Sequence, residues 1–133
     1  MDKHDLVELS EEQCWWHLAE MTVGRLAVSV ANRPDIFPVN YRIDGETIVV
    51  KTAPGFKLAA ATLGDGVAFE VDKLDESART GWSVVVHGTA AEVELLEDLL
   101  AADDLHVEPW ASGSKNHYIR ITPSDLTGRA INP

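Results

Sequence analysis

The residues best suited to binding chemistry lie on both sides of a break between a strand and a helix. Thr52 ends an apolar, β-branched run, Ala53-Pro54-Gly55 interrupts it, and Lys57 falls in the first turn of a short helical pattern over 56–63. A hydroxyl and an ammonium can converge on one phosphate at such a junction, where backbone N–H groups and the helix dipole also favour anions. The spacing therefore predicts a phosphate site formed by Thr52, Lys57 and the backbone between them.

The charge of the surrounding segment supports an anionic ligand. Residues 24–58 hold five of the eleven basic residues and only three acids, a local balance of about +2, whereas the formal net charge of the 133-residue chain is -11. The five basic residues are Arg25, Arg33, Arg42, Lys51 and Lys57. A positive segment in an acidic protein predicts a negatively charged partner.

Short apolar runs separated by turn residues predict the elements that position these side chains. Strands are expected over 24–30, 36–43, 46–52, 66–72, 81–92 and 117–122. Asp44-Gly45 predicts a tight hairpin, Pro38 requires an edge, an end or a bulge, and Gly88 predicts a bulge or bend. A capping box from Ser10 to Gln13 opens one helix, and a second is expected over 93–102. Short strands with few helices predict a mainly β protein built as a small antiparallel barrel.

In their order and spacing, these pieces resemble the flavin-binding split β-barrel proteins of the pyridoxamine 5'-phosphate oxidase-like superfamily. The small nitroimidazole-reductase-like members are the most similar. The matching segments are GRLAV, FPVNYRIDGETIVVKT, GFK, VAFEVD, TGWSVVVHGTA and YIRITPSDLTGR, which together span residues 23–129. The resemblance implies a six-stranded antiparallel split β-barrel with Greek-key connections and two or three short helices, forming a single FMN-binding domain over residues 1–133.

The resemblance also implies a set of cofactor-binding residues. The set consists of Val39, Asn40, Tyr41, Lys51, Thr52, Lys57, Trp82, Ser83 and Trp110. Lys51 should face the side opposite Thr52 in a regular strand. Trp82 equally suits a core aromatic, and Trp110, in a loop over 105–116, equally suits packing on the barrel rim. No catalytic side chain is predicted, because a flavin itself carries out hydride transfer.

The implied function is FMN-dependent oxidoreduction of an unidentified small molecule, with NADH or NADPH as a candidate electron donor. Two alternatives remain open: a flavin or haem carrier without turnover, and a reductase that uses the deazaflavin F420, whose polyanionic tail would suit Arg25, Arg33 and Arg42. Pyridoxamine 5'-phosphate oxidase activity itself is not expected. Enzymes with that activity carry a C-terminal segment with arginine and histidine, and here only Arg129 remains in TGRAINP.

Three strands are apolar on both faces, which predicts that something covers the outside of the barrel. These runs are Leu26-Ala27-Val28, Ile48-Val49-Val50 and Val84-Val85-Val86. A second copy would cover them, and the resemblance implies a homodimer with flavin between the protomers. The helices of the same chain are the alternative cover.

Several classes of protein are not expected. A pI near 4.7 argues against nucleic-acid binding. The sequence contains no apolar run of about 18 residues, so no membrane span is predicted. Cys14 is the single cysteine, and the five histidines lack metal-ligand spacing. The start MDKHDLVELS does not read as a signal peptide. A cytoplasmic protein is the resulting prediction.

Overall fold

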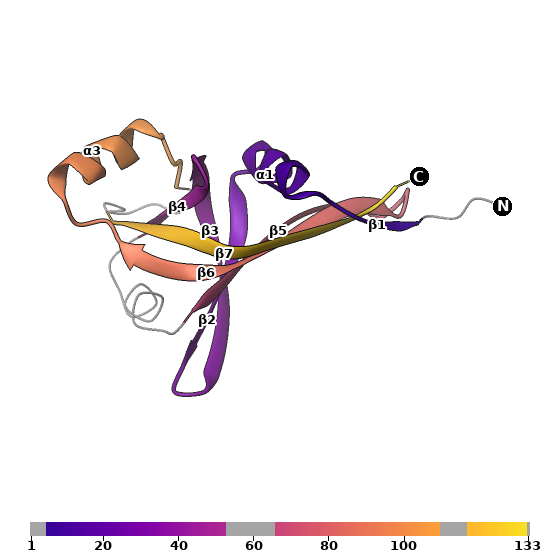
Figure 1. Cartoon of the computed structure of the whole chain (residues 1–133), viewed down its shortest axis with the longest axis horizontal. Coiled ribbons are helices and arrows are strands. Elements are labelled where there is room, and N and C mark those ends of the chain that lie inside the picture. Colours follow the sequence, from indigo (N-terminus) through magenta and orange to yellow (C-terminus); the bar gives the residue numbers. More distant parts are fainter. Residues whose placement is uncertain (1–4, 53–65, 110–116, 133) are drawn as a thin grey trace.

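The computed structural model describes residues 5–52, 66–109 and 117–132. Its elements are β1 (Leu6–Glu8), α1 (Glu11–Glu20), β2 (Val23–Val30), β3 (Arg33–Asp44), β4 (Thr47–Thr52), β5 (Val67–Asp75), β6 (Thr80–Glu92), α3 (Leu96–Asp104) and β7 (His117–Ile131). The strands of this part form an antiparallel sheet in the order β1-β7-β4-β3-β2-β5-β6, and β6 also pairs with β7. That pairing closes β2 to β7 into the predicted six-stranded barrel (Figure 1).

The hairpin of β2 and β3 is longer than predicted. Its turn is Ala31-Asn32, and both residues have positive φ, as a two-residue hairpin turn with the twist of the strands requires. Pro38 pairs with Arg25 of β2, whereas the pairing of β3 with β4 begins only at Asn40. Among the described residues Pro38 therefore has a strand neighbour on one side only, which agrees with the predicted edge position.

Strand β7 extends nine residues beyond the predicted end at Thr122, and β1 is not among the predicted strands. β7 pairs first with β4, then with β6 along most of its length, and finally also with β1. The register of β6 and β7 shifts between His87 and Gly88, which confirms the predicted bulge. A Cβ at Gly88 would lie 2.2 Å from the Thr122 carbonyl oxygen, so the backbones approach too closely for a side chain.

The barrel interior is filled by every second residue of its strands. The fully buried interior side chains include Leu26, Tyr41, Ile48, Val50, Phe69, Val71, Val84, Val86 and Ile121. Helix α1 covers one side of this core with Cys14 and Leu18 (Figure 1). The predicted capping box is confirmed: the Ser10 hydroxyl accepts from the Gln13 N–H at 3.1 Å, and the Ser10 N–H donates to the Gln13 side chain at 2.8 Å.

Part of the outer face is covered within the chain. Val49 and Tyr118 point outward from β4 and β7 and pack with Ala102 and Val107, from α3 and the segment after it, in a second buried cluster. One of the runs that are apolar on both faces is therefore covered by a helix of the same chain. Ala27 and Val85, the outward residues of the other two runs, remain partly exposed.

Candidate functional site

The outer face of β3 and β4 carries a polar, positively charged strip. Asn40 and Arg42 point outward from β3, and the register places Asn40 beside Lys51 of β4. Lys51 in turn pairs with Tyr118 of β7, and its ammonium lies 5.5 Å from the centre of the Tyr118 ring, within cation–π range. Arg42 and Lys51 form no ion pair with any residue in the part of the chain that the structure describes.

Tyr118 forms a fixed wall of this strip. Its side chain is almost fully buried, and its hydroxyl donates a short hydrogen bond to the Asp103 carboxylate of α3. Burial first, and then the hydrogen bond and charge of Asp103, raise the pKa of Tyr118 to about 12. The phenol therefore stays protonated at neutral pH and holds α3 against the sheet.

Thr52 lies at the end of β4 and faces the side opposite Lys51. It pairs with His117, the first residue of β7, on the face that carries Ile48 and Val50. His117 Nδ1 lies 2.9 Å from the Glu92 carboxylate. The side chains of Lys51 and Thr52 therefore lie on opposite faces of β4, as the alternation of a regular strand predicts. Lys57 and the turn over 53–56, the other parts of the predicted phosphate site, lie outside the described residues.

Three predicted cofactor residues have side chains in the core. Val39 and Tyr41 belong to the buried interior of β3, and the Tyr41 hydroxyl donates to the Leu18 carbonyl at 2.6 Å. Trp82 is 8% exposed and stacks on His17 of α1, with ring centres 4.4 Å apart. These side chains face away from the outer strip, so at Val39 and Tyr41 only the backbone remains for a ligand there.

The predicted outward residues belong to two separate groups. Asn40 and Lys51 lie together on β3 and β4, and Lys51 pairs with Tyr118 of β7. Ser83 of β6 pairs with Arg129, eleven residues further along the same strand (129 minus 118). One chain therefore does not bring Ser83 next to Asn40 and Lys51 on the outer face. Trp110 lies outside the described residues, so its predicted contact remains a prediction.

The basic segment is less positive in three dimensions than in the sequence. The Arg25 guanidinium lies 3.2 Å from Glu70 and 3.6 Å from Asp72, both on β5. Arg33 sits at the exposed tip of the β2–β3 hairpin. The two acids lie about 45 residues further along the chain and meet Arg25 only through the β2–β5 pairing, so no local sequence pattern indicates them.

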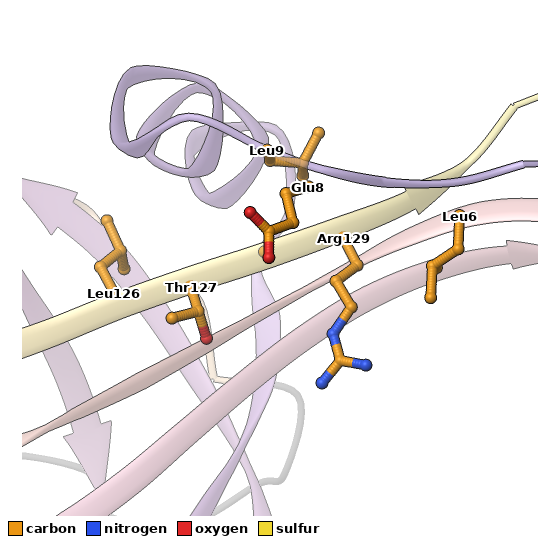
Figure 2. Close-up of a pocket in the computed structure, with 7 residues that line it drawn as sticks. Leu6, Glu8, Leu9, Leu126, Thr127 and Arg129 are labelled. Carbon is orange, nitrogen blue, oxygen red and sulfur yellow. The ribbon is translucent and has the colours of Figure 1, made fainter.

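A second feature that was not predicted is a cavity beside β7, between this strand and residues 6–9. It has a volume of about 500 Å³, and its lining residues are Leu6, Glu8, Leu9, Leu126, Thr127, Gly128 and Arg129 (Figure 2). The missed signal is the alternation of Leu126, Gly128 and Ala130 with Thr127, Arg129 and Ile131, which is typical of a strand with one buried face. This alternation is obscured by Pro123 and Gly128, which are typical of turns, so no strand was predicted beyond Thr122.

A model of the pyridoxamine 5'-phosphate oxidase family matches residues 10–130. The chain belongs to this family. The resemblance seen in the sequence is thereby confirmed, and the barrel is the split barrel of the pyridoxamine 5'-phosphate oxidase family.

Solved structures support the same assignment. A candidate pyridoxamine 5'-phosphate oxidase from Corynebacterium glutamicum is 36% identical, with a TM-score of 0.87 over 97% of this chain and 100% of that one. An FAD binding protein from Mycobacterium smegmatis is 35% identical, with a TM-score of 0.80 over 93% and 97%. An FAD-binding protein from Mesorhizobium loti is 25% identical, with a TM-score of 0.84 over 98% and 100%.

Neither a membrane-spanning helix nor a metal-binding cluster is present in the part of the chain that the structure describes. None of the helices in residues 5–52, 66–109 and 117–132 is long and apolar enough to cross a membrane. The same residues contain no group of three or more histidine, cysteine or acidic side chains placed to bind a metal.

Proposed function

We propose that this member of the pyridoxamine 5'-phosphate oxidase family binds a flavin and acts as an FMN-dependent oxidoreductase on a small molecule. The observation that carries the proposal is the relation to two FAD-binding proteins, at 35% and 25% identity, each of which aligns with more than nine tenths of this chain. When bound, a flavin supplies hydride transfer at its N5 atom. The protein then needs to bind and orient it.

The strip on β3 and β4 fits such a ligand. The ammonium of Lys51 and the guanidinium of Arg42 can receive a phosphate, since charge-assisted hydrogen bonds to phosphate are the strong ones. The Asn40 amide both donates and accepts, which suits the pyrimidine edge of the ring. Tyr118 is locked by Asp103 and packs beneath the Lys51 ammonium, which restricts the positions the lysine adopts.

FMN and FAD share the flavin ring and the first phosphate, so the relatives' cofactor suits the same strip. Titration of the purified protein with FMN, FAD and F420, followed by flavin fluorescence or absorption, separates the three. Saturable FMN binding supports the proposal. FAD binding without FMN binding would mean that the cofactor is FAD and not FMN. If none of the three binds, the proposed function is wrong.

A second measurement separates an oxidoreductase from a carrier. NADH or NADPH is added to the flavin-loaded protein under anaerobic conditions, and the flavin absorption is followed. Bleaching and its reversal by an added electron acceptor support turnover. Stable bound flavin that neither donor reduces supports a carrier. A cytoplasmic location is part of the proposal and is tested by cell fractionation.

The proposed assembly is a homodimer. Within one chain Ser83 lies apart from Asn40 and Lys51, so a second copy is needed to bring both groups to one flavin. The partly exposed Ala27 and Val85 also favour a covered outer face. Sedimentation at micromolar concentration should give about twice the chain mass of 14.5 kDa.

A further inference from the structure

Helix α3 exposes apolar side chains as well as burying them. Ala102 faces the sheet and is fully buried. Leu95, Leu96 and Leu100 are instead 65%, 72% and 58% exposed, and Leu96 and Leu100 lie one helical turn apart. We call these three residues the leucine patch. Figure 1 shows α3 at the opposite end of the molecule from β1, so the leucine patch lies away from the N-terminal strand and α1.

Acidic residues flank the leucine patch along the chain. Residues 92–109 contain seven acids and neither lysine nor arginine: Glu92, Glu94, Glu97, Asp98, Asp103, Asp104 and Glu108. Two of the seven have partners within the chain, since Glu92 lies 2.9 Å from His117 and Asp103 accepts from Tyr118. The other five form no ion pair with residues 5–52, 66–109 or 117–132. The patch is therefore bordered by negative charge.

These side chains do not serve the stability of α3 as a helix. Leu95 occupies the N-cap and supplies no side-chain hydrogen bond, and the last turn contains no basic residue. Asp103 and Asp104 instead place negative charge at the negative end of the helix dipole, which is unfavourable. In α1, by contrast, Ser10 caps the first turn and His17 lies in the last. The acids and exposed leucines of α3 thus suit a contact with another molecule.

We propose that α3 docks a basic amphipathic helix of a partner protein. The apolar side of that helix would pack on the leucine patch, and its lysine or arginine side chains would lie opposite the flanking acids. Contacts between an amphipathic helix and its receptor use apolar anchors spaced three or four residues apart, as Leu96 and Leu100 are. Complementary charge selects a basic partner. It disfavours a second copy bound through the same side, because residues 92–109 of two copies would bring like charges together.

A partner bound to α3 would lie beside the strip on β3 and β4. Asp103 of α3 holds the Tyr118 hydroxyl, and the Lys51 ammonium lies 5.5 Å from the centre of the Tyr118 ring. One packed side chain therefore separates α3 from Lys51. Docking itself requires no flavin, so the inference goes beyond the proposed function.

A labelled peptide tests the docking surface. The probe is a fluorescein-labelled peptide of about 18 residues, long enough to form a helix, with leucine and lysine at amphipathic spacing. Its binding to the full flavin-free chain is measured by fluorescence anisotropy at physiological ionic strength. The wild type should bind it saturably. A scrambled peptide of the same composition keeps the charge and loses the apolar side, so it should bind about tenfold more weakly or worse.

Two variants with matched controls locate the contact. Leu96→Asn removes an apolar anchor and Glu97→Lys reverses a flanking charge, so each should weaken binding of the amphipathic peptide about tenfold. Leu74→Asn changes a leucine of β5 that is 67% exposed, and Glu12→Lys changes the second residue of α1, as Glu97→Lys does in α3. Both controls should bind like the wild type. Circular dichroism checks that each variant is folded.

Four outcomes would overturn the inference. The first is the absence of saturable binding to the wild type. The second is equal binding of the scrambled peptide, which would reflect general attraction between opposite charges only. The third is controls that weaken binding as much as the α3 variants do. The fourth is loss of self-association in Leu96→Asn by sedimentation, which would mean that a second copy covers the patch. Flavin titration of the wild type is a separate measurement, so failure of the docking surface and failure of the proposed function are distinguishable.

Discussion

The Tyr41 hydroxyl donates a 2.6 Å hydrogen bond to the Leu18 carbonyl and ties β3 to the last turn of α1. The last carbonyls of a helix lack partners within the helix, so Tyr41 satisfies one that would otherwise be buried without one. The Tyr41 N–H also donates to the Thr22 carbonyl at 3.0 Å. Both bonds fix α1 on the barrel.

Tyr41→Phe should therefore act on stability and not on flavin binding. Loss of the hydroxyl leaves the Leu18 carbonyl unsatisfied in the core, so we expect the free energy of unfolding to fall by about 1–2 kcal/mol. Urea denaturation measures the change, and flavin titration should show unaltered affinity. A weaker flavin complex with unchanged stability would instead make the hydroxyl a ligand contact.

Gly88→Ala should destabilise the barrel at its bulge. The added methyl would lie 2.2 Å from the Thr122 carbonyl oxygen, and the β6 and β7 backbones would have to separate. Overpacking of this kind costs about 1–3 kcal/mol. Gly66→Ala is the matched control, because its methyl meets its nearest atom at an ordinary 3.5 Å. Equal melting temperatures for the two variants would contradict this account of the bulge.

Lys51→Ala should weaken flavin binding. A charge-assisted phosphate contact contributes roughly 1.5–3 kcal/mol, so the dissociation constant should rise about tenfold or more. Lys73→Ala removes an exposed lysine from β5, away from the strip, and should leave the affinity unchanged. Fluorescence titration measures both. If Lys51→Ala binds flavin like the wild type, the strip on β3 and β4 does not receive the phosphate.

Glu70 should make the folded chain less stable as the pH rises. In the unfolded chain the carboxyl titrates near its ordinary pKa, about 4.3. In the folded chain burial first, and then the hydrogen bond and charge of Asp72, raise the pKa to about 7, while Arg25 acts in the opposite direction. Between these values the unfolded chain has lost the proton and the folded chain retains it. The free energy of unfolding should therefore fall over this window and level off above it.

Glu70→Gln removes this titration. The stability of the variant relative to its parent should rise by about 1 kcal/mol between about pH 5 and pH 8, because the side chain, 28% exposed, is partly screened by solvent. Thermal denaturation of both proteins across this pH range measures the difference. A pH-independent difference between the two proteins would show that Glu70 titrates normally.

The sequence predicted the elements whose signals are local. The alternation of buried residues, the two-residue hairpin after Asp44 and the bulge at Gly88 all depend on nearby residues and match the structure. The continuation of β7 past Pro123 depends on partners in β6 and β1, which no local pattern contains. The burial of Val39, Tyr41 and Trp82 likewise depends on α1 and on which face of each strand turns inward.

The candidate site was predicted with less success for the same reason. The placement of Lys51 opposite Thr52 follows from strand geometry alone. The pairing of Arg25 with Glu70 and Asp72 requires the β2–β5 register, which the sequence does not reveal. The charge summed over residues 24–58 therefore overestimates the positive charge that a ligand would meet on the folded surface.

Strand β7 also determines the order in which the chain can fold. It pairs with β4, β6 and β1, so the barrel lacks its closing strand until the residues from 117 onward have left the ribosome. Until then β4 and β6 are open edges, which can pair with other chains. Contacts between segments so far apart in sequence also slow folding. Closure is therefore a late event after synthesis, and the emerging protein is most prone to aggregation just before it.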